Sequence, residues 1–512
     1  MTTLGAQYRR RFNLALILTM AGITSCALRG AGVRSPDLAK IHTIVVLYAE
    51  NRSFDNLYGM FPGANGIEQA LKNPELYTQR DLDGSIMSSL PPVWRASRDL
   101  STKPVPDPAF PTHLANQPFR IDAGQINLGL STPTRDLVHR FYQSREQIDG
   151  GKNDRFAALS DAGALAMGYY DGSVLPMWRI AKEYTLADNF FMGAFGSSFL
   201  NHFWLVCACT PEFRSASSAL RAHVDADGRL VRKPDCPASA LRSPALVADG
   251  AVTPDGYAVN TLQPPYQPSG VPPAPDGDRG YADAGIATVL PPQTAETIGD
   301  KLTRNGIDWA WYASSWRAAV TDGMRDRSLQ RTVIYATDHG APNFQAHHMP
   351  FNYFARFDPR TGAAERTAHL KDGEDFLRDI MNGTLPPVAF YKPHGALNEH
   401  PGYTDVLSGD QHIAEIVRKL QASPQWKNMV IIVTYDENGG FWDHVAPPRS
   451  DEWGPASRIP AIVVSPFAKR AYIDHTTYDT TSILKLITER FGLEWLPGIR
   501  REVGDLTNAL DL

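Results

Sequence analysis

The sequence predicts an α/β fold in which helices cover a mostly parallel sheet. Four short runs rich in Val and Ile lack the alternation of a half-exposed strand, and segments with helical spacing of apolar residues lie between them. The order strand, helix, strand is typical of parallel sheets, because a helical crossover returns the chain in the same direction. The 512 residues, 43% of them hydrophobic, are sufficient for a large core.

The individual elements are expected where the apolar patterns are clearest. Pro and Gly become dense in residues 210–295 and periodicity fades there, which indicates a loop-rich insertion or lid within residues 27–512 rather than a separate domain. The predicted strands are residues 41–50, 386–392, 428–437 and 459–466, and the predicted helices lie within residues 173–184, 411–423 and 480–492.

Residues 1–26 are predicted to be an export signal. A basic region precedes an apolar stretch that is short for a bilayer, and small residues follow. Arg9 and Arg10 fit a twin-arginine signal, although consecutive arginines also suit the ordinary secretory route. The signal ends like a lipoprotein cleavage box with Cys26 as the acylated residue, and plain cleavage nearby is the alternative. The expected location is therefore the periplasm, the outer membrane through a lipid anchor, or the medium.

Charge and cysteine content narrow the partners and the covalent chemistry. A formal net charge of -5 gives no basic footprint, so nucleic acid is not an expected partner. Beyond the signal, the cysteines are Cys207, Cys209 and Cys236. In an oxidising compartment we expect one disulfide, most easily between Cys236 and one of the neighbouring pair. A metal site is the weaker interpretation, because a single C-x-C lacks the usual zinc spacing.

Acidic and amide side chains follow two of the predicted strands directly. Glu50 and Asn51 end one strand, and Asp436 and Glu437 end another. Ligands of open parallel sheets gather at the carboxyl ends of the strands, so neighbouring strands would bring three carboxylates and an amide together. Such carboxylates repel unless their pKa values rise or a cation lies between them. Helix caps and solvated loops are the alternative, but two pairs at two strand ends favour a metal site.

A serine nucleophile and several histidines complete the candidate site. Ser197 and Ser198 follow two glycines and precede an apolar segment, where backbone N–H groups could hold an anion, although many such turns are only turns. Imidazolium groups can bind phosphoryl oxygens or protonate a leaving group, while each histidine alone is more typical of a surface position. The histidines in polar, loop-like contexts are His113, His202, His347, His348 and His400.

Three motifs resemble a known family. The segments ENRSFDNLYG at 50–59 and TYDENGGFWDHVAPP at 434–448 are similar to the two acidic motifs of the bacterial phosphoesterase family that contains phospholipases C and acid phosphatase A. ADNFFMGAFGSSFLNH at 187–202 resembles the nucleophile motif, and its ending is closer to the acid phosphatase A branch. The resemblance spans most of residues 27–512, which it identifies as one catalytic domain.

The resemblance implies an alkaline-phosphatase-like α/β/α sandwich with its site at the strand ends. Ser198 would be the nucleophile, because it stands three residues before Asn201 as in the family motif. One divalent metal ion, whose identity among Ca, Mg, Mn, Zn and Fe stays open, would be bound near it. The implied metal ligands are Glu50, Asn51, Asp436, Glu437 and the Ser198 oxygen, and the implied groups around the phosphoryl are His113, His347, His348 and His400.

Three functions remain open at this point. The first is an acid phosphatase that cleaves phosphomonoesters through a phosphoserine intermediate, with greatest activity on the acid side of neutrality. The second is a phospholipase C that cleaves phospholipid phosphodiesters. Thr480, where the phospholipases often have His, and an end at Leu512 without their extra modules favour the first. The third is an envelope-anchored protein with a structural cation and no enzymatic activity. The oligomeric state is not predicted.

Overall fold

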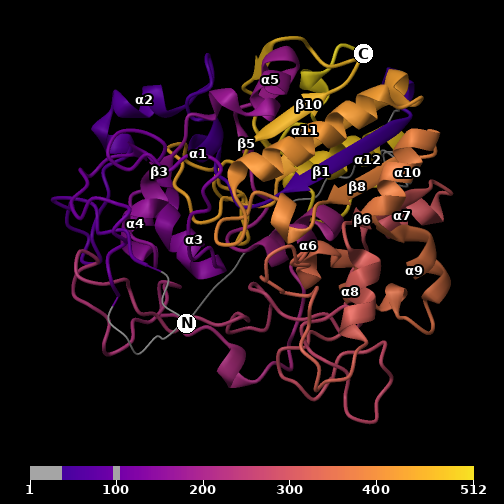
Figure 1. The fold of residues 1–512 in the computed structure, drawn as a ribbon, viewed down its shortest axis with the longest axis horizontal. Helices are drawn as coiled ribbons and strands as arrows, with labels where there is room; N and C mark the ends of the chain where they lie inside the picture. The colour runs from indigo at the N-terminus through magenta and orange to yellow at the C-terminus, as the bar shows by residue number, and fades with distance from the viewer. Residues whose placement is uncertain (1–36, 96–103) are drawn as a thin grey trace, which may run out of the picture.

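The computed structural model describes residues 37–95 and 104–512 of this protein. The predicted export signal and Cys26 lie outside the described residues, so export and lipid attachment stay predictions. Among the helices of these two ranges, none combines the length with the hydropathy that crossing a bilayer requires. The centre of the molecule is an eight-stranded sheet with the order β11-β4-β10-β9-β1-β8-β6-β7 (Figure 1). Its strands are β1 Thr43–Ala49, β4 Thr185–Ala187, β6 Trp309–Ala313, β7 Leu370–Asp372, β8 Val388–Lys392, β9 Met429–Tyr435, β10 Ala461–Val464 and β11 Tyr472–Asp474.

The mostly parallel sheet is confirmed, with one exception. The two central strands β1 and β9 are buried along their whole length and pair in parallel from Thr43 with Met429 to Ala49 with Tyr435. β10 is antiparallel to both of its neighbours. The strand predicted within residues 459–466 is present as β10, but it runs opposite to the strands on either side. The chain between β9 and β10 contains no helix, so no crossover returns it to the starting edge.

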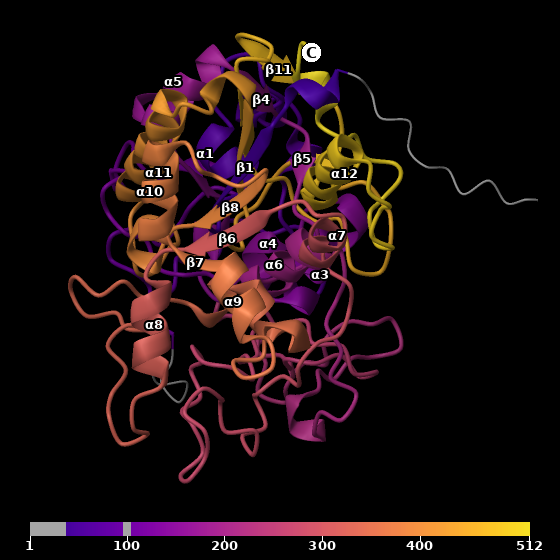
Figure 2. The ribbon, with the colours of Figure 1, turned by 90° about the vertical axis from the view of Figure 1, so that its right-hand side faces the viewer.

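Helices cover both faces of the sheet, as Figure 2 shows. α5 (Pro176–Glu183), α10 (Gly373–Asn382) and α11 (Val406–Ala422) lie on one face, where α11 packs against β1 and α5. α6 (Ser198–Cys207), α7 (Ile298–Arg304) and α12 (Thr480–Phe491) lie on the other. The three predicted helices are present as α5, α11 and α12. α11 starts earlier than expected because Asp405 caps it, its side chain accepting the Ser408 N–H at 2.8 Å. α12 ends at Gly492, whose left-handed φ of 66° suits a glycine.

Smaller elements surround this sandwich. β2 Phe119–Arg120 pairs with β3 Gly168–Tyr169, and β5 Phe190–Phe191 pairs with β12 Tyr478–Asp479. The α-helices are α1 Phe54–Tyr58, α2 Ile67–Leu71, α3 Phe141–Ile148, α4 Phe156–Leu159, α5 Pro176–Glu183, α6 Ser198–Cys207, α7 Ile298–Arg304, α8 Trp316–Gly323, α9 Ala363–His369, α10 Gly373–Asn382, α11 Val406–Ala422 and α12 Thr480–Phe491.

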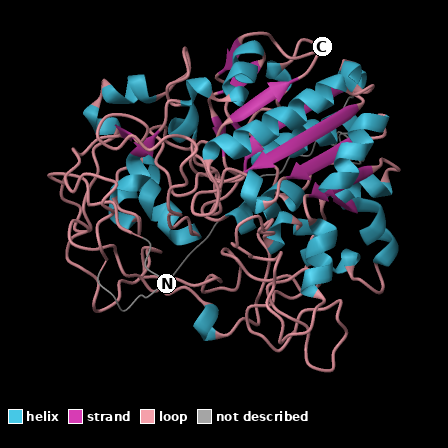
Figure 3. Ribbon diagram, viewed as in Figure 1, coloured by secondary structure: helices cyan, strands magenta, loops and turns pink. Residues whose placement is uncertain are grey.

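The segment 210–295 consists of loops and turns with a single short helical turn, and Figure 3 shows how much of that side of the molecule is loop. Specific side chains attach it to the rest of the fold. The Asn260 side-chain oxygen accepts the Phe141 N–H at 3.0 Å, at the start of α3. Within the segment, the Gln293 side chain exchanges two hydrogen bonds with the backbone of Glu212, so its two ends are held together. The loops therefore have a fixed position beside the helix that begins at the site described below.

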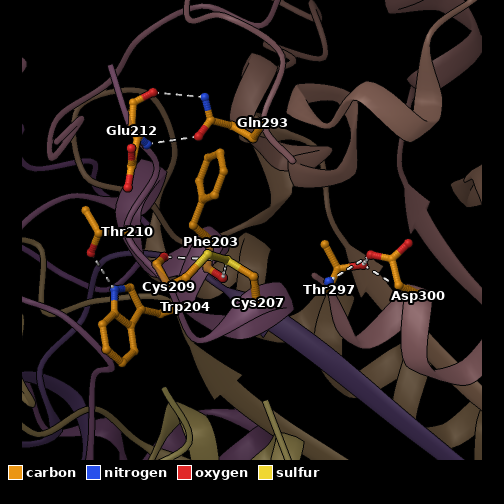
Figure 4. The surroundings of a disulfide bond; sticks show 9 residues. All are labelled: Phe203, Trp204, Cys207, Cys209, Thr210, Glu212, Gln293, Thr297 and Asp300. Atoms are coloured by element: carbon orange, nitrogen blue, oxygen red, sulfur yellow. Dashed lines mark hydrogen bonds between the residues drawn. A yellow bond between two sulfur atoms is a disulfide. The ribbon is translucent and has the colours of Figure 1, made fainter. Parts of the chain in front are cut away.

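The disulfide joins Cys207 to Cys209, and within the described residues Cys236 is a free, half-buried thiol (Figure 4). The expected pairing of Cys236 with one of the two is therefore wrong. Cys207 is the last residue of α6, and Ala208 takes a left-handed conformation that turns the chain back sharply. The two Cα atoms consequently lie 5.1 Å apart, within the usual range for a disulfide despite the short separation.

Candidate active site

The ends of β1 and β9 bring the two acidic pairs together. Because Ala49 pairs with Tyr435, the next residues, Glu50 and Asp436, leave the sheet side by side. Asp436 Oδ1 accepts the backbone N–H of Asn51 at 3.1 Å and that of Glu437 at 2.8 Å. Asn51 takes a left-handed φ of 62°, which an asparagine tolerates better than most residues. The predicted convergence of these four side chains is present in the structure.

Ser198 stands at the first turn of α6 and points into this cluster. Its hydroxyl lies 3.1 Å from Asn51 Oδ1 and 3.3 Å from Glu437 Oε1, and it donates to either oxygen. Ser197 precedes the helix as its N-cap, but the Ser197 hydroxyl is buried without a hydrogen-bond partner. Asn201 fixes the turn, since its amide binds the backbone of Ala194 in both directions. The geometry therefore places Ser198, and not Ser197, among the carboxylates.

A buried lysine lies between the two strand-end carboxylates. Lys392 Nζ is 2.8 Å from Glu50 Oε1 and 3.9 Å from Asp436 Oδ2. Glu50 Oε2 accepts the Asn398 amide at 2.6 Å and the Tyr403 hydroxyl at 3.0 Å. One ammonium cannot balance the three acidic side chains, so the cluster keeps an excess of negative charge when all three are ionised.

Burial and mutual repulsion set the acidity of these carboxyl groups. Burial, with the neighbouring charge of Glu50, raises the pKa of Asp436 to about 7. Burial also raises the pKa of Glu437 to about 8, with Asp436 adding to the effect. Burial alone would raise the pKa of Glu50, but His348 and Lys392 outweigh it and hold that pKa well below its usual value. The cluster thus resists full ionisation until further positive charge is added.

The predicted histidines His347, His348 and His400 lie in the site, together with His202. His348 Nε2 contacts Glu50 Oε1, and His400 Nε2 accepts from the Asn51 amide at 3.0 Å. His202 Nδ1 donates to the Ser198 carbonyl at 2.7 Å, and the His347 ring lies 5.3 Å from that of His202. Burial lowers the pKa of all four, that of His348 to about 4. They are therefore neutral at pH 7, and an acidic optimum based on charged imidazoles stays a prediction.

His113 is placed elsewhere, and His139 stands in the site without having been predicted. His113 is exposed, and no contact joins it to the other site residues in the described part of the chain. His139 Nε2 lies 3.5 Å from Glu437 Oε1 and 3.3 Å from the Asn51 amide nitrogen. Burial would lower the pKa of His139, but Glu437 and Asp136 outweigh it and raise the pKa to about 9. His139 is thus the charged imidazole beside the carboxylates.

The donor set fits one divalent cation. Asp436 Oδ2 is fully buried and has no hydrogen-bond donor, and Glu50 Oε1 has no well-directed one. Carboxylate oxygens, an amide oxygen and a hydroxyl are typical ligands of hard divalent metals. Glu50, Asn51, Asp436, Glu437 and Ser198 can therefore hold the ion that the sequence predicts, and its positive charge would favour the ionised carboxylates.

A cavity of about 480 Å³ leads to the site from the surface. His139 and Ser197 line it, together with Arg140 and with Asn260 from the loop segment 210–295. This volume lies within the range of sites for small molecules. The inserted loops therefore contribute to the wall of the entrance, as a lid would.

A second acidic cluster next to the site is not a metal site. Asp55, Asp443 and His444 are buried within reach of one another. The Arg458 guanidinium fills the space between them, with Nε 2.8 Å from Asp443 Oδ1 and Nη2 3.1 Å from Asp55 Oδ1. His444 and Arg458 outweigh the burial that would raise the pKa of Asp55 and hold it below its usual value. This cluster ties the segments after β1 and β9 to each other.

Glu399 and Asp410 are both buried in the core behind the site. Ionised Asp410 lowers the free energy of unfolding by an amount that depends on pH. Burial raises the pKa of Asp410 to about 7, and its Oδ2 has no hydrogen-bond partner. An unfolded aspartate titrates near about pH 4, so between these values the folded chain binds more protons and stability falls as pH rises. Asp410→Asn should therefore raise the free energy of unfolding by about 1–3 kcal/mol near pH 8 and by little near pH 4.

Chemical unfolding at the two pH values measures this difference. The substituted amide keeps an oxygen in the place of Asp410 Oδ1, which accepts the Met177 N–H at 3.0 Å, so the change removes charge with little loss of bonding. Glu415→Gln is the matched control, because it removes one charge from the exposed side of the same helix. An equal effect of Asp410→Asn at both pH values would contradict the assignment.

The fold and the site together define a class of proteins. It is an α/β protein with a serine hydroxyl among buried carboxylates at the carboxyl ends of parallel strands. The model of the Phosphoesterase family matches residues 41–494. The chain therefore belongs to the Phosphoesterase family, as the motifs predict.

Curated relatives with this similarity are phospholipases C. The chain is 25% identical to Phospholipase C B of Mycobacterium tuberculosis, over 96% of this chain and 82% of that protein. It is 23% identical to Non-hemolytic phospholipase C of Burkholderia pseudomallei, over 94% of this chain and 60% of that protein. The predicted closeness to the acid phosphatase A branch is not tested by these matches and stays a prediction.

Solved structures match at low similarity. One, from Vibrio parahaemolyticus, is described as a protein in the alkaline phosphatase superfamily, with a TM-score of 0.32, 8% identity and coverage of 73% of this chain and 71% of that chain. Another is the lipoteichoic acid synthase LtaP from Listeria monocytogenes, with a TM-score of 0.30, 9% identity and 74% coverage of each chain. The α/β class rests on the strand pairing of this structure itself.

Proposed function

We propose that this protein hydrolyses phosphate esters, and that phospholipid phosphodiesters are its main substrates, as for a phospholipase C. The reaction type is supported by the Ser198 hydroxyl among Asn51 and Glu437. The substrate class is carried by the similarity to Phospholipase C B along 96% of the chain. This favours the second of the three functions that the sequence leaves open.

The proposed nucleophile is held for attack by its neighbours. Ser198 Oγ donates its hydrogen toward Asn51 Oδ1 or Glu437 Oε1, which leaves its lone pairs free for phosphorus. Glu437 Oε1 accepts the Ser198 hydroxyl at 3.3 Å, and in its ionised form it can take the hydroxyl proton. Attack forms a phosphoserine and breaks the bond to the leaving oxygen, which takes a proton from a histidine or water and departs as the alcohol. Water then hydrolyses the phosphoserine.

A bound divalent ion would polarise the phosphoryl oxygens and favour the serine alkoxide. Its holders would be Glu50, Asn51, Asp436 and Glu437, together with the Ser198 oxygen. Lys392 keeps Glu50 ionised and in place through its 2.8 Å contact. The His139 imidazole lines the entrance cavity beside Glu437 Oε1, where its positive charge would stabilise negative charge that develops on the transferred group.

Phosphomonoesters are the second candidate substrates, because Thr480 occupies a position where phospholipases often have His. Thr480 is fully buried at the start of α12, and its hydroxyl has no hydrogen-bond partner. It packs close to Gly193 in the nucleophile segment. A threonine there offers the site no imidazole for a diester leaving group.

The test is a parallel assay of the purified protein on a phosphorylcholine diester and on a chromogenic phosphate monoester. We expect faster turnover of the diester, and loss of about a hundredfold or more of either activity on exposure to a chelator, since the carboxylates lose their counter-charge. Restoring activity with single divalent metals then identifies the ion. Faster turnover of the monoester would return the assignment to an acid phosphatase.

The third hypothesis, a protein with a structural cation alone, predicts no hydrolysis of any ester. Thermal unfolding with and without chelator separates the two roles of the metal. A large fall in midpoint without hydrolysis in the untreated protein would contradict the proposed function and favour the structural role.

A further inference from the structure

A second cleft, separate from the entrance to the serine site, contains a buried guanidinium without a hydrogen-bond or ion-pair partner in the described residues. It has a volume of about 670 Å³ and lies between residues 80–84, the end of α3 with the turns that follow it (146–155), and residues 225–232 of the inserted loops. None of the residues that line it also lines the entrance to the serine site. We call it the Arg155 cleft. It contains five basic and four acidic side chains. The ion pairs among them decide which of the cations can still bind a ligand.

Arg155 is the reason for expecting a ligand there. Arg155 is only 8% exposed, and within the described residues its guanidinium makes neither a hydrogen bond nor an ion pair. Glu146, Asp149 and Asp154 act on it only at longer range. A guanidinium stays charged in proteins, and a buried charge without a partner is costly. A bound anion would remove this cost.

Arg232 provides a second guanidinium on the same cleft, and no carboxylate forms an ion pair with it in the described residues. Its Nη2 donates to the Leu82 carbonyl at 2.5 Å. The other cations are engaged: Arg80 with Asp154 at 3.1 Å, and Lys152 with Asp149 at 2.7 Å. Two unpaired guanidinium groups on one cleft match an oxygen-rich anion, which each can bind with two parallel N–H donors.

The acidic side chains of the cleft keep their charge, but in the described residues none of them forms an ion pair with Arg155 or Arg232, because other donors of the chain bind their oxygens. Glu146 accepts the Leu230 N–H at 2.7 Å. Asp149 faces Lys152 and, at 3.8 Å, Arg229. Asp225 accepts the backbone N–H groups of Asp227 and Arg229. Asp83, the remaining one, is bonded to Ser85.

We propose that the Arg155 cleft binds a small oxyanion, a phosphate or carboxylate group on a polar molecule, through Arg155 and Arg232. The volume leaves room for an organic substituent beyond the anionic group. The site does not depend on the proposed hydrolysis, because it uses none of the groups around Ser198.

The test measures binding of inorganic phosphate and of succinate to the metal-loaded protein by calorimetry. We expect each of Arg155→Gln and Arg232→Gln to raise the Kd of the cleft by about tenfold or more, since each removes a charge-assisted bidentate contact. Arg229→Gln is the matched control, because it removes a cation of the same cleft that already faces Asp149, and its Kd should change less than about threefold. A response to phosphate alone assigns a phosphate group, and a response to both probes assigns oxyanions in general.

Stability and activity give independent readouts. Both probes should raise the unfolding midpoint of the wild type, and Arg155→Gln should abolish that rise while leaving kcat on the monoester unchanged. Arg232 is exposed, so Arg232→Gln tests the site even if Arg155→Gln folds poorly. Binding that persists undiminished in both variants, or no binding of either probe outside the serine site, would overturn the proposal.

Discussion

Replacing Ser198 by alanine is expected to lower kcat by about ten-thousandfold or more, because the hydroxyl is the only one that reaches both Asn51 and Glu437 in the described structure. The fold should be retained, since the Ser198 side chain is small and the N-terminus of α6 is fixed by Asn201. Steady-state assays and the unfolding midpoint measure the two effects separately. In the wild type, quenched turnover should yield a peptide phosphorylated at Ser198.

Ser197→Ala is the matched control for this prediction. Ser197 lies one residue earlier on the same turn and lines the entrance cavity, but its hydroxyl bonds to nothing in the described structure. We expect it to change kcat by less than about tenfold. Retained turnover in Ser198→Ala together with loss in Ser197→Ala would move the nucleophile by one residue.

The position of the candidate metal ligands was predictable because they follow the two most strongly patterned strands. β1 and β9 are continuous apolar runs, and Glu50 and Asp436 are the first polar residues after them. The sequence does not state that these strands are neighbours, since strand order depends on how the crossovers pack. That step came from resemblance, and the register of Ala49 with Tyr435 supplies it in the structure.

Lys392 could have been found by the same rule and was not. It is the last residue of β8, which pairs with β1, so its ammonium lies at the same edge as Glu50. A lysine at the end of an apolar strand is usually interpreted as the point where the strand reaches solvent, so its place among the buried carboxylates was not predicted. His139 carries no comparable signal, because it belongs to a loop whose position depends on the fixed start of α3 at Phe141.

The errors have local physical causes. His113 has a polar, loop-like sequence context like that of His347, and only the tertiary structure shows that it is exposed. β4, β7 and β11 have three residues each, too few for a periodic pattern. The Cys207–Cys209 bond needs the left-handed Ala208, which composition does not indicate.

The two acidic motifs also contain residues with a structural role, which is to hold the two motif segments together. Asp55 belongs to the first motif, and Asp443 and His444 belong to the second, and Arg458 joins all three. Their position next to the carboxylates of the candidate site follows from this structural role. By tying the turn after β1 to the loop after β9, Arg458 keeps the segments that present Asn51 and Glu437 in a fixed relation.

Arg458→Met is therefore expected to lower the free energy of unfolding by about 3–5 kcal/mol, because it leaves two buried carboxylates without their shared counter-ion. The same change removes hydrogen bonds at 2.8 Å to the Asn65 carbonyl and at 2.7 Å to the Asp188 carbonyl. Arg458→Lys restores the charge without the planar fork and should recover part of the loss. Chemical unfolding of the three proteins measures the series.

Arg470→Met provides the matched control, since it also removes an arginine from an ion pair, with Glu183 at 2.9 Å, but both side chains are more than half exposed. Solvent screens such a pair, and we expect a loss below about 1 kcal/mol. If Arg458→Met were no more damaging than Arg470→Met, the buried network could not be what aligns the two motif segments. A larger effect in Arg458→Met, with Arg458→Lys between, would show that the motifs are joined by charge as well as by packing.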